Sequence, residues 1–249
     1  MDRAFGCGPK DCRFNSCRAH QKGKVKVFWF ASLRSATNWY SILGEGNFLI
    51  LMIKAVIFDT DGMIIRSERY FSQRFSDKFG IPMEKILPFF KNEFQLCLVG
   101  KADIKIELAK YIKEWGWKKS VDDLLAYWFE YESKTDERIL GSIKVLRSKG
   151  IKCYLHTNNE KYRVQYLLDK VGLKNFFDGA FSSAELGFLK PQQEFWSAIH
   201  NHLGKPDKSE VLVWDDDKEN IESAKSFGFH SEFYSGLDSY ELRMKSLIG

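Results

Sequence analysis

No apolar run in this chain of 249 residues reaches the ~18 residues that a membrane-spanning helix requires. Most of the chain also lacks an excess of either positive or negative charge. Residues 1–51 carry 8 Lys and Arg against 3 Asp and Glu, which leaves 30 basic and 30 acidic side chains in residues 52–249. The net charge of +5 therefore belongs to the first segment. A neutral main body predicts no face for nucleic acid and none for a membrane.

Cysteine is scarce as well, with five in the chain. Three lie near the amino terminus: Cys7, Cys12 and Cys17. With His20 as a fourth ligand, their spacing fits no common zinc finger. The other two, Cys97 and Cys153, are widely separated, which is typical of reduced thiols in a cytoplasmic protein.

Residues 1–51 do not resemble the remainder of the chain. Their apolar patch, Val25–Leu33, is a poor match to a signal peptide, because Arg34 stands where a small-residue cleavage site would be needed. The first strand pattern begins just after Met52. We therefore interpret residues 1–51 as a leader outside the fold, preceding a natural start at Met52, and expect it to be dispensable.

Two carboxylates follow a strand-like run. The apolar, β-branched run Ala55–Phe58 is too short for a helix and predicts a strand buried on both faces. Asp59 and Asp61 end it, and a turn at Gly62 can place both side chains around one point. Unpaired buried carboxylates cost several kcal/mol, so this pair indicates a site. A solvated turn is the alternative for so short a motif.

A helical pattern replaces the strand pattern after Gly62. Its first stripe is aromatic: Tyr70, Phe71, Phe75 and Phe79. Helical patterns continue at residues 104–116 and 121–132, and no convincing strand interrupts residues 66–138. With apolar residues at 44% and aromatic residues at 15%, there is ample material for a core. We expect an all-helical inserted domain, residues 67–138, whose aromatic stripes form its own core.

From residue 139 onward the pattern alternates between helix and strand. The expected strands are Cys153–His156, Gly179–Ser182, Val211–Trp214 and Glu232–Tyr234. Strands that alternate with helices of this length predict an α/β fold with a doubly wound, Rossmann-like parallel sheet. We expect this core to comprise residues 52–66 and 139–249. In such sheets, ligands bind outside the carboxyl ends of the strands.

Polar residues gather at these strand ends. They are Asp59, Asp61, Thr157, Asn158, Lys190, Asp215 and Asp216. Taken singly, Thr157 could cap a helix, Lys190 could be solvated, and the run ending at Asp217 could be an acidic turn. Together, carboxylates from two strand ends would repel unless a cation lay among them, and oxygen ligands in that number suit Mg²⁺. A hydroxyl, a backbone turn and a lysine beside the cation would receive phosphate.

Four motifs in this order resemble the haloacid dehalogenase superfamily, in the subfamily I branch whose helical cap lies between the first and second motifs. The resemblance covers residues 52–249. The matching residues are Asp59-Thr60-Asp61-Gly62, then Thr157-Asn158, then Gly187-Phe188-Leu189-Lys190-Pro191, and finally Asp215-Asp216 with Asn220, Ala224 and Gly228.

The resemblance implies a role for each residue. Asp59 would be the nucleophile that forms an aspartyl-phosphate, and Asp61 the general acid that then activates water. Thr157, the Asn158 backbone and Lys190 would bind the phosphoryl group. Mg²⁺ would be held by carboxylates and a backbone carbonyl. Its ligands would be the Asp59 and Asp216 side chains and the Asp61 carbonyl, with Asp215 in support.

The implied activity is Mg²⁺-dependent hydrolysis of a small phosphomonoester, such as a sugar phosphate or nucleotide, by a cytoplasmic monomer or homodimer. Arg66 stands where many relatives carry a small or acidic residue, and we expect it to bind the substrate beside the cap. Tyr70 and Lys101 are further candidates, and each could equally be an ordinary surface residue.

Three alternatives stay open on the sequence. A haloacid dehalogenase has no alkoxide to protonate, needs no metal and lacks the second Asp, so Asp61 argues against it. A non-catalytic binding protein of this fold would have lost one of the motif residues, and all are present. A phosphomutase differs only in whether a sugar or water accepts the phosphoryl group from Asp59.

Overall fold

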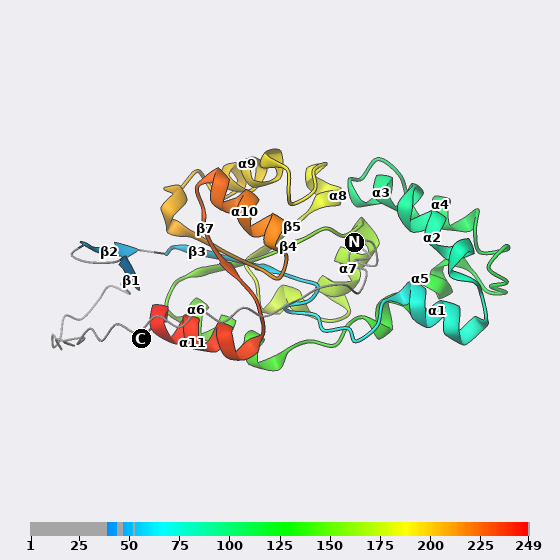
Figure 1. Cartoon of the computed structure of the whole chain (residues 1–249), viewed down its shortest axis with the longest axis horizontal. Coiled ribbons are helices and arrows are strands. Elements are labelled where there is room, and N and C mark those ends of the chain that lie inside the picture. Colours follow the sequence, from blue (N-terminus) through cyan, green and yellow to red (C-terminus); the bar gives the residue numbers. More distant parts are fainter. Residues whose placement is uncertain (1–38, 44–46, 52, 249) are drawn as a thin grey trace, which may run out of the picture. The chain divides into compact units, whose positions relative to one another are not determined.

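The computed structural model describes residues 39–43, 47–51 and 53–248. A five-stranded sheet forms the core of the described chain, and all of its strands are parallel (Figure 1). In spatial order the strands are β5 (Gly179–Ser182), β4 (Lys152–Thr157), β3 (Ala55–Asp59), β6 (Val211–Asp215) and β7 (His230–Phe233). The predicted α/β class with a doubly wound parallel sheet is confirmed. Within the described part of the chain, no helix has both the length and the apolar composition to cross a membrane.

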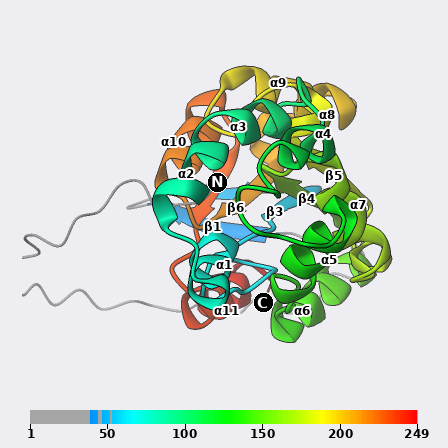
Figure 2. The same cartoon turned by 90° about the vertical axis from the view of Figure 1, so that its right-hand side faces the viewer.

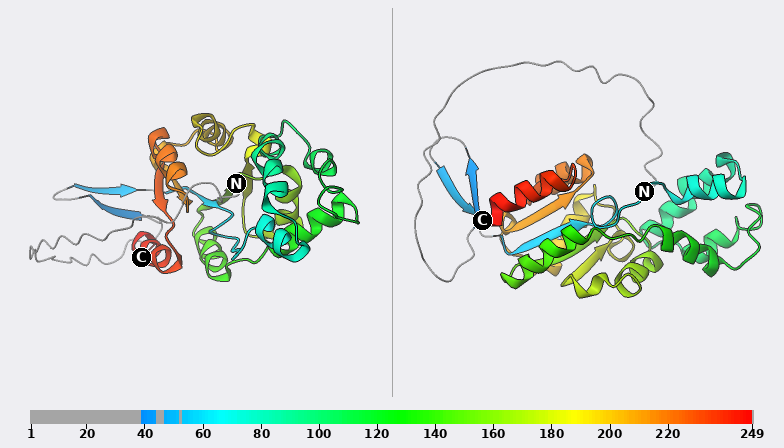
Figure 3. Two further views of the ribbon diagram at one scale, coloured as in Figure 1. Left: turned by 45° about the vertical axis from the view of Figure 1, so that its right-hand side comes forward. Right: turned by 90° about the horizontal axis from the view of Figure 1, so that it is seen from below.

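Helices cover both faces of this sheet (Figures 1 and 3). On one face lie α6 (Glu137–Ser148), α7 (Lys161–Asp169) and α11 (Leu237–Ile248), and on the other α9 (Gln193–His202) and α10 (Lys218–Phe227). Strand β3 shows why both faces need covering. Val56 and Phe58 pack toward α6, whereas Ile57 packs toward α9. This alternation follows from the two-residue period of a strand.

Three short elements complete the core: the helix α8 (Ser183–Leu186) and the 3-10 turns η1 (Leu173–Asn175) and η2 (Lys208–Glu210). The strand bounds differ slightly from those expected. Asp59, Thr157 and Asp215 are each the last residue of a strand rather than the first residue after it. Three polar residues thus share one edge of the sheet. Strand β7 lies at the end of the sheet and is half-exposed, so its apolar pattern is weak and its expected range was displaced.

A helical domain lies beyond this edge of the sheet, as Figures 1 and 2 show. Its helices are α1 (Phe71–Phe79), α2 (Met83–Lys91), α3 (Glu93–Leu98), α4 (Ile104–Ala109) and α5 (Val121–Tyr131). Their buried side chains form a cluster of their own, rich in aromatic rings. Phe71 stacks on Trp128 with ring centroids 4.6 Å apart. The predicted aromatic stripes therefore do form the core of this domain, which we call the cap.

The chain enters and leaves the cap through two adjacent segments. The backbone N–H of Arg66 donates to the carbonyl of Lys134, and that of Asp136 donates to the carbonyl of Ile64, each at 2.9 Å. An antiparallel bridge joins Ile65 to Thr135 between them. The two crossings form a short ribbon, close to the positions expected near residues 65–66 and 136. The exact domain limits stay a prediction.

A further pair of strands precedes the sheet. Strands β1 (Trp39–Leu43) and β2 (Asn47–Leu51) pair antiparallel, within the segment interpreted as a leader. The sequence pattern predicted no strand there. Cys7, Cys12, Cys17, His20 and the patch 25–33 lie outside the described residues, and the dispensability of residues 1–51 stays a prediction.

Candidate active site

Asp59 lies at the centre of the strand edge and is 2% exposed. Its Oδ1 accepts a hydrogen bond from its neighbour's backbone N–H, that of Thr60, at 2.7 Å, and one from the Nζ of Lys190 at 2.6 Å. The Thr60 hydroxyl donates to the carbonyl of His156 on the adjacent strand. Backbone and side-chain donors therefore hold the carboxylate of Asp59 in one orientation.

Lys190 joins the ends of two neighbouring strands. Its ammonium also donates to Oδ2 of Asp215, at 2.9 Å, so one buried cation bridges two carboxylates. Burial lowers the pKa of Lys190, but Asp215 and Asp59 raise it by more, and the net shift is upward. Its loop is anchored by Asn158, whose Oδ1 accepts the backbone N–H of Lys190 at 3.0 Å. The structure thus brings four predicted site residues together.

The acidic run Asp215–Asp217, which begins with the last residue of β6, divides into three roles. Asp215 is buried and also accepts from the Nδ2 of Asn220 at 3.0 Å, which agrees with the motif register that the Asn220 spacing indicated. Asp217 caps helix α10, accepting from the backbone N–H of Glu219 at 2.9 Å. Asp216 lies against Gly62, where a Cβ would stand 2.1 Å from Asp216 Oδ2. Gly62 also has a φ of +93°, which side chains rarely adopt.

Negative charge exceeds positive charge in this cluster. Burial, followed by the charge of Asp215, raises the pKa of Asp59 well above its ordinary value despite the bond from Lys190. Although burial works against it, Lys190 holds the pKa of Asp215 below its ordinary value. Together with Asp216 these groups are hard oxygen donors, and Gly62 leaves space for the Asp216 carboxylate to approach the backbone. The donor set therefore fits Mg²⁺.

His156 is a member of this cluster that the sequence analysis missed. Among the described residues, Asp59, His156 and Asp215 offer ligand atoms within 4.8 Å of one another. The imidazole is fully buried, and its Nε2 lies 3.1 Å from the carbonyl oxygen of Trp214. Burial, followed by the charge of Lys190, lowers the pKa of His156 to about 3, so the ring is neutral. The neutral ring packs beside the carboxylates and adds no charge to the cluster.

Asp61 lies at the rim, with its side chain about half exposed. Two donors reach it, one from the loop before α7 and one from the first turn of α7 (Lys161–Asp169). Asn159 Nδ2 donates to Oδ2 of Asp61 at 2.5 Å and lies 2.6 Å from the Thr157 hydroxyl. The Nη2 of Arg163 lies 3.4 Å from Oδ1 of Asp61. Neither donor was among the predicted residues, although an arginine within the apolar stripe of α7, beside Tyr166 and Leu167, was a signal in the sequence.

The candidates at the cap side lie apart from these contacts. Arg66 binds Asp136 Oδ2 at 2.8 Å and the hydroxyl of Tyr234 at 2.9 Å, so its guanidinium ties the cap crossing to the core. Tyr70 stands at the start of α1 and is 37% exposed. Substrate binding by Arg66 stays a prediction. Its contacts with Asp136 and Tyr234 also stabilise the cap crossing.

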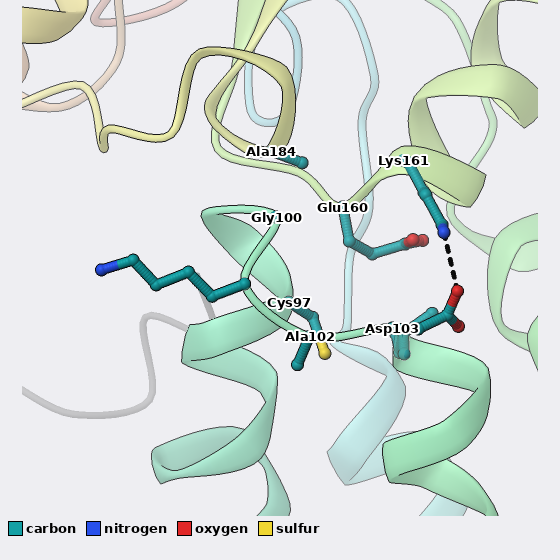
Figure 4. A pocket seen from close by; sticks show the side chains of 9 residues that line it. Cys97, Gly100, Ala102, Asp103, Glu160, Lys161 and Ala184 are labelled. Carbon is teal, nitrogen blue, oxygen red and sulfur yellow. Dashed lines mark ion pairs between the residues drawn. The ribbon is translucent and has the colours of Figure 1, made fainter.

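A cavity of about 290 Å³ lies between the cap and the start of α7 (Figure 4). Its lining comprises Cys97, Gly100, Lys101, Ala102, Asp103 and Ile104 from the cap with Glu160, Lys161 and Ala184 from the core. The ammonium of Lys161 pairs with Asp103 at 2.7 Å, as the dashed line in Figure 4 shows. Gly100 approaches Ala184 so closely that a Cβ would meet its carbonyl oxygen at 2.3 Å. Cap and core are therefore in direct contact here.

The sheet, the inserted helices and the carboxylate cluster define a class of protein. A family model described as a haloacid dehalogenase-like hydrolase matches residues 53–228. The chain belongs to the haloacid dehalogenase (HAD)-like hydrolase family. The predicted family and the prediction of a hydrolase are confirmed, and placement in subfamily I stays a prediction.

Individual relatives are more distant. A "phosphorylated carbohydrates phosphatase" of Thermotoga maritima is 26% identical over 185 residues, which span 71% of this chain and 82% of that protein. A HAD family enzyme of Bacteroides thetaiotaomicron, solved as a magnesium complex, has a TM-score of 0.66 at 21% identity and covers 77% of this chain and 98% of its own. An L-2-haloacid dehalogenase of Xanthobacter autotrophicus, with chloropropionic acid covalently bound, has a TM-score of 0.54 at 21% identity, with coverages of 80% and 85%. The two structures establish a shared fold alone.

Proposed function

We propose that the protein is a Mg²⁺-dependent phosphatase of a small phosphomonoester, most readily a sugar phosphate, that works through an aspartyl-phosphate on Asp59. One observation carries this proposal. The buried Asp59 carboxylate is held by Lys190, and Asp61 stands two residues further on at the rim, where a leaving group can reach it. The name of the Thermotoga maritima relative supports a phosphorylated carbohydrate as the substrate class.

The reaction follows from these positions. An oxygen of Asp59 attacks phosphorus, the bond from phosphorus to the ester oxygen breaks, and Asp61 gives its proton to the departing alkoxide. Asp61 then takes a proton from water, which attacks the phosphoryl group and releases inorganic phosphate and free Asp59. Thr157, the Asn158 backbone and Lys190 bind the phosphoryl oxygens. Mg²⁺, held by Asp59, Asp216 and the Asp61 carbonyl with support from Asp215, would supply positive charge for the transferring group.

Asp61 also argues against the alternative of a haloacid dehalogenase. A halide leaves without a proton, so dehalogenation gives no use to a second carboxylate beside the nucleophile. Here Asp61 accepts a hydrogen bond from the side-chain amide of Asn159 at 2.5 Å. The same amide lies 2.6 Å from the Thr157 hydroxyl, so Asn159 connects the two residues. This link between acid and phosphate-binding hydroxyl favours phosphoryl transfer. A phosphomutase shares all of these features and is separated from a phosphatase only by its product.

The cavity beside the cap supports a small substrate. Its volume of about 290 Å³ suits a metabolite-sized group, and its lining includes none of Asp59, Asp61, Thr157 and Lys190, so we propose that it takes a part of the substrate other than the phosphoryl group. Charged groups from both sides, Lys101 and the Lys161–Asp103 pair, offer partners for hydroxyl or anionic groups of a sugar phosphate. We further propose that the protein works in the cytoplasm as a monomer or homodimer and needs neither nucleic acid nor membrane.

The test is a screen of phosphorylated metabolites with Mg²⁺ present, in which released inorganic phosphate is measured. Sugar phosphates should be turned over fastest, intact phosphoproteins should not be, and excess chelator should abolish turnover until Mg²⁺ is added back. The Asp216→Ala variant should behave as the chelated enzyme does. Full turnover in chelator would refute the metal-dependent mechanism, and transfer to a sugar without phosphate release would indicate the mutase.

Gly62→Ala should weaken Mg²⁺ binding by displacing the carboxylate of Asp216. Its added Cβ would stand 2.1 Å from Asp216 Oδ2, so the carboxylate must move, and we expect kcat/KM to fall about 100-fold or more with a higher Mg²⁺ requirement. Gly80→Ala is the matched control, because Gly80 has a φ of +65° but its Cβ would meet nothing within 4 Å. It should cost about 1 kcal/mol of stability and leave the Mg²⁺ dependence unchanged. Equal effects of both variants would exclude a role for the Gly62–Asp216 approach.

A further inference from the structure

Arg163 is a buried arginine whose guanidinium faces both the cap and the core. It lies in the first turn of α7, a helix of the core, and is 3% exposed. Glu160, the N-cap of α7, accepts the backbone N–H of Arg163 at 2.6 Å, which fixes where the side chain starts. A buried guanidinium must have several acceptors to be tolerated. Arg163 finds three acceptors on two segments, the end of α5 and the turn that carries Asp61.

Two acceptors belong to the cap. The Nη1 of Arg163 donates to the carbonyl of Phe129 at 3.1 Å, and its Nη2 donates to the carbonyl of Glu132. Helix α5 ends at Tyr131, so these are carbonyls of its last turn and of the residue that follows. Such carbonyls lack partners within the helix and carry partial negative charge. The guanidinium therefore closes the end of α5, the segment that leads into the returning crossing of the cap.

The third acceptor is Asp61. The same Nη2 lies 3.4 Å from Oδ1 of Asp61, and Asn159 donates to the other oxygen at 2.5 Å. Each oxygen of the carboxylate thus faces one donor, Asn159 from the loop before α7 or Arg163 from its first turn. Because Asn159 also lies 2.6 Å from the Thr157 hydroxyl, this orientation keeps Asp61 beside the phosphate-binding hydroxyl. Arg163 is the member of the pair that also contacts the cap.

We propose that Arg163 is a positioning residue that couples the seated cap to the orientation of Asp61. When the end of α5 lies against α7, the guanidinium is held by Phe129 and Glu132, and the second N–H of its Nη2 faces Asp61. When the cap moves away, Arg163 loses these acceptors, and the acid loses its fixed orientation. A lysine would not reproduce these contacts, because its three N–H donors lie on one nitrogen, whereas Arg163 uses two nitrogens of a planar fork. This inference rests on the proposed phosphatase function.

The test compares leaving groups. General-acid catalysis contributes about 10²- to 10⁴-fold when the leaving group is a basic alkoxide and little when it is a stable phenolate. The substrates are therefore glycerol phosphate, an alkyl ester, and 4-nitrophenyl phosphate, compared by kcat/KM because this constant reports only steps up to the first irreversible one. For Arg163→Lys and Arg163→Met we expect a loss of about 30-fold or more on the alkyl ester and less than about threefold on the aryl ester.

The matched control is Tyr162→Phe. The Tyr162 hydroxyl joins the same helix to the cap, donating to Asp103 Oδ2 at 2.9 Å, but it does not contact Asp61. This variant should change both substrates by the same small factor. In an Asp61→Asn background, Arg163→Lys should cause no further loss on the alkyl ester, because the two residues act as one unit.

The outcomes distinguish a failure of the proposed role of Arg163 from a failure of the proposed phosphatase activity. Equal losses on both esters in the Arg163 variants, or additive losses with Asp61→Asn, would assign Arg163 to the fold and overturn the inference. If Arg163→Met does not fold, Arg163→Lys and the double variant still decide. A wild-type enzyme that hydrolyses neither these two esters nor any phosphorylated metabolite of the screen would instead refute the proposed phosphatase, and the inference with it.

Discussion

Replacing Asp59 by Asn should reduce hydrolysis of every phosphomonoester by at least about 10⁴-fold, because the amide oxygen is a poor nucleophile and no aspartyl-phosphate can form. The variant should still fold, because asparagine keeps the shape and can accept the bonds that Lys190 and the Thr60 N–H now give to Asp59. Phosphate release with excess enzyme over substrate is the measurement. Asp217→Asn is the control, since Asp217 caps α10 and should tolerate the change with activity within about threefold.

The same variant tests the electrostatics of the site. Burial and the charge of Asp215 raise the pKa of Asp59. A carboxyl group whose pKa is raised on folding reduces stability as the pH rises from its unfolded to its folded pKa. Metal-free wild type should therefore lose stability above about pH 4, the unfolded pKa, and Asp59→Asn should reduce that loss, leaving the part due to Glu132 and Glu160, whose pKa values burial raises to about 7. Residual turnover close to that of the wild type, or an unchanged pH profile of the melting temperature, would contradict this assignment.

Lys190→Met should have the largest effect on stability. It would leave Asp59 and Asp215 facing each other in a buried site without the ammonium that lies 2.6 Å and 2.9 Å from them. Removing one partner of a buried ion pair costs about 3–5 kcal/mol, and turnover should fall about 10³-fold or more because the phosphoryl charge loses its lysine. Urea unfolding without metal measures the first effect.

A surface pair provides the control for Lys190. Lys174 pairs with Asp169 at 2.9 Å, but both side chains are about half exposed, so Lys174→Met should cost less than about 1 kcal/mol. Combining Asp59→Asn with Lys190→Met should restore part of the lost stability, because one of the two facing charges is then gone. If the double variant is no more stable than Lys190→Met, repulsion between the carboxylates is not the cause.

The sequence predicted those site residues whose positions follow from strand patterns and short motifs. Asp59, Thr157 and Asp215 end parallel strands, and parallel strands bring their carboxyl ends to one edge, so their meeting followed from strand patterns alone. Lys190 was predictable from its motif. Helix α2 was harder to foresee, because Pro88 lies inside it and proline normally interrupts a helical pattern.

The residues that were missed depend on contacts between distant segments. Arg163 meets Phe129 and Glu132 only because α5 of the cap ends against α7 of the core, which no periodicity describes. No sequence pattern indicated Asp136 and Tyr234 as partners of Arg66, and its contact with the substrate stays a prediction. A charged residue near a strand end has many possible partners, and its choice among them is set by packing.

The ribbon formed by the two cap crossings has a thermodynamic consequence for the whole chain. Since Ile64 and Asp136 are hydrogen-bonded to each other, the cap is a closed loop whose ends already meet in the core. The entropy of closing such a loop grows slowly, by about 0.6 kcal/mol for each doubling of its length, so the core loses little by carrying a whole domain there. The cap also has its own buried cluster. We therefore expect the cap to unfold as a cooperative unit separate from the sheet that carries Asp59 and Asp215.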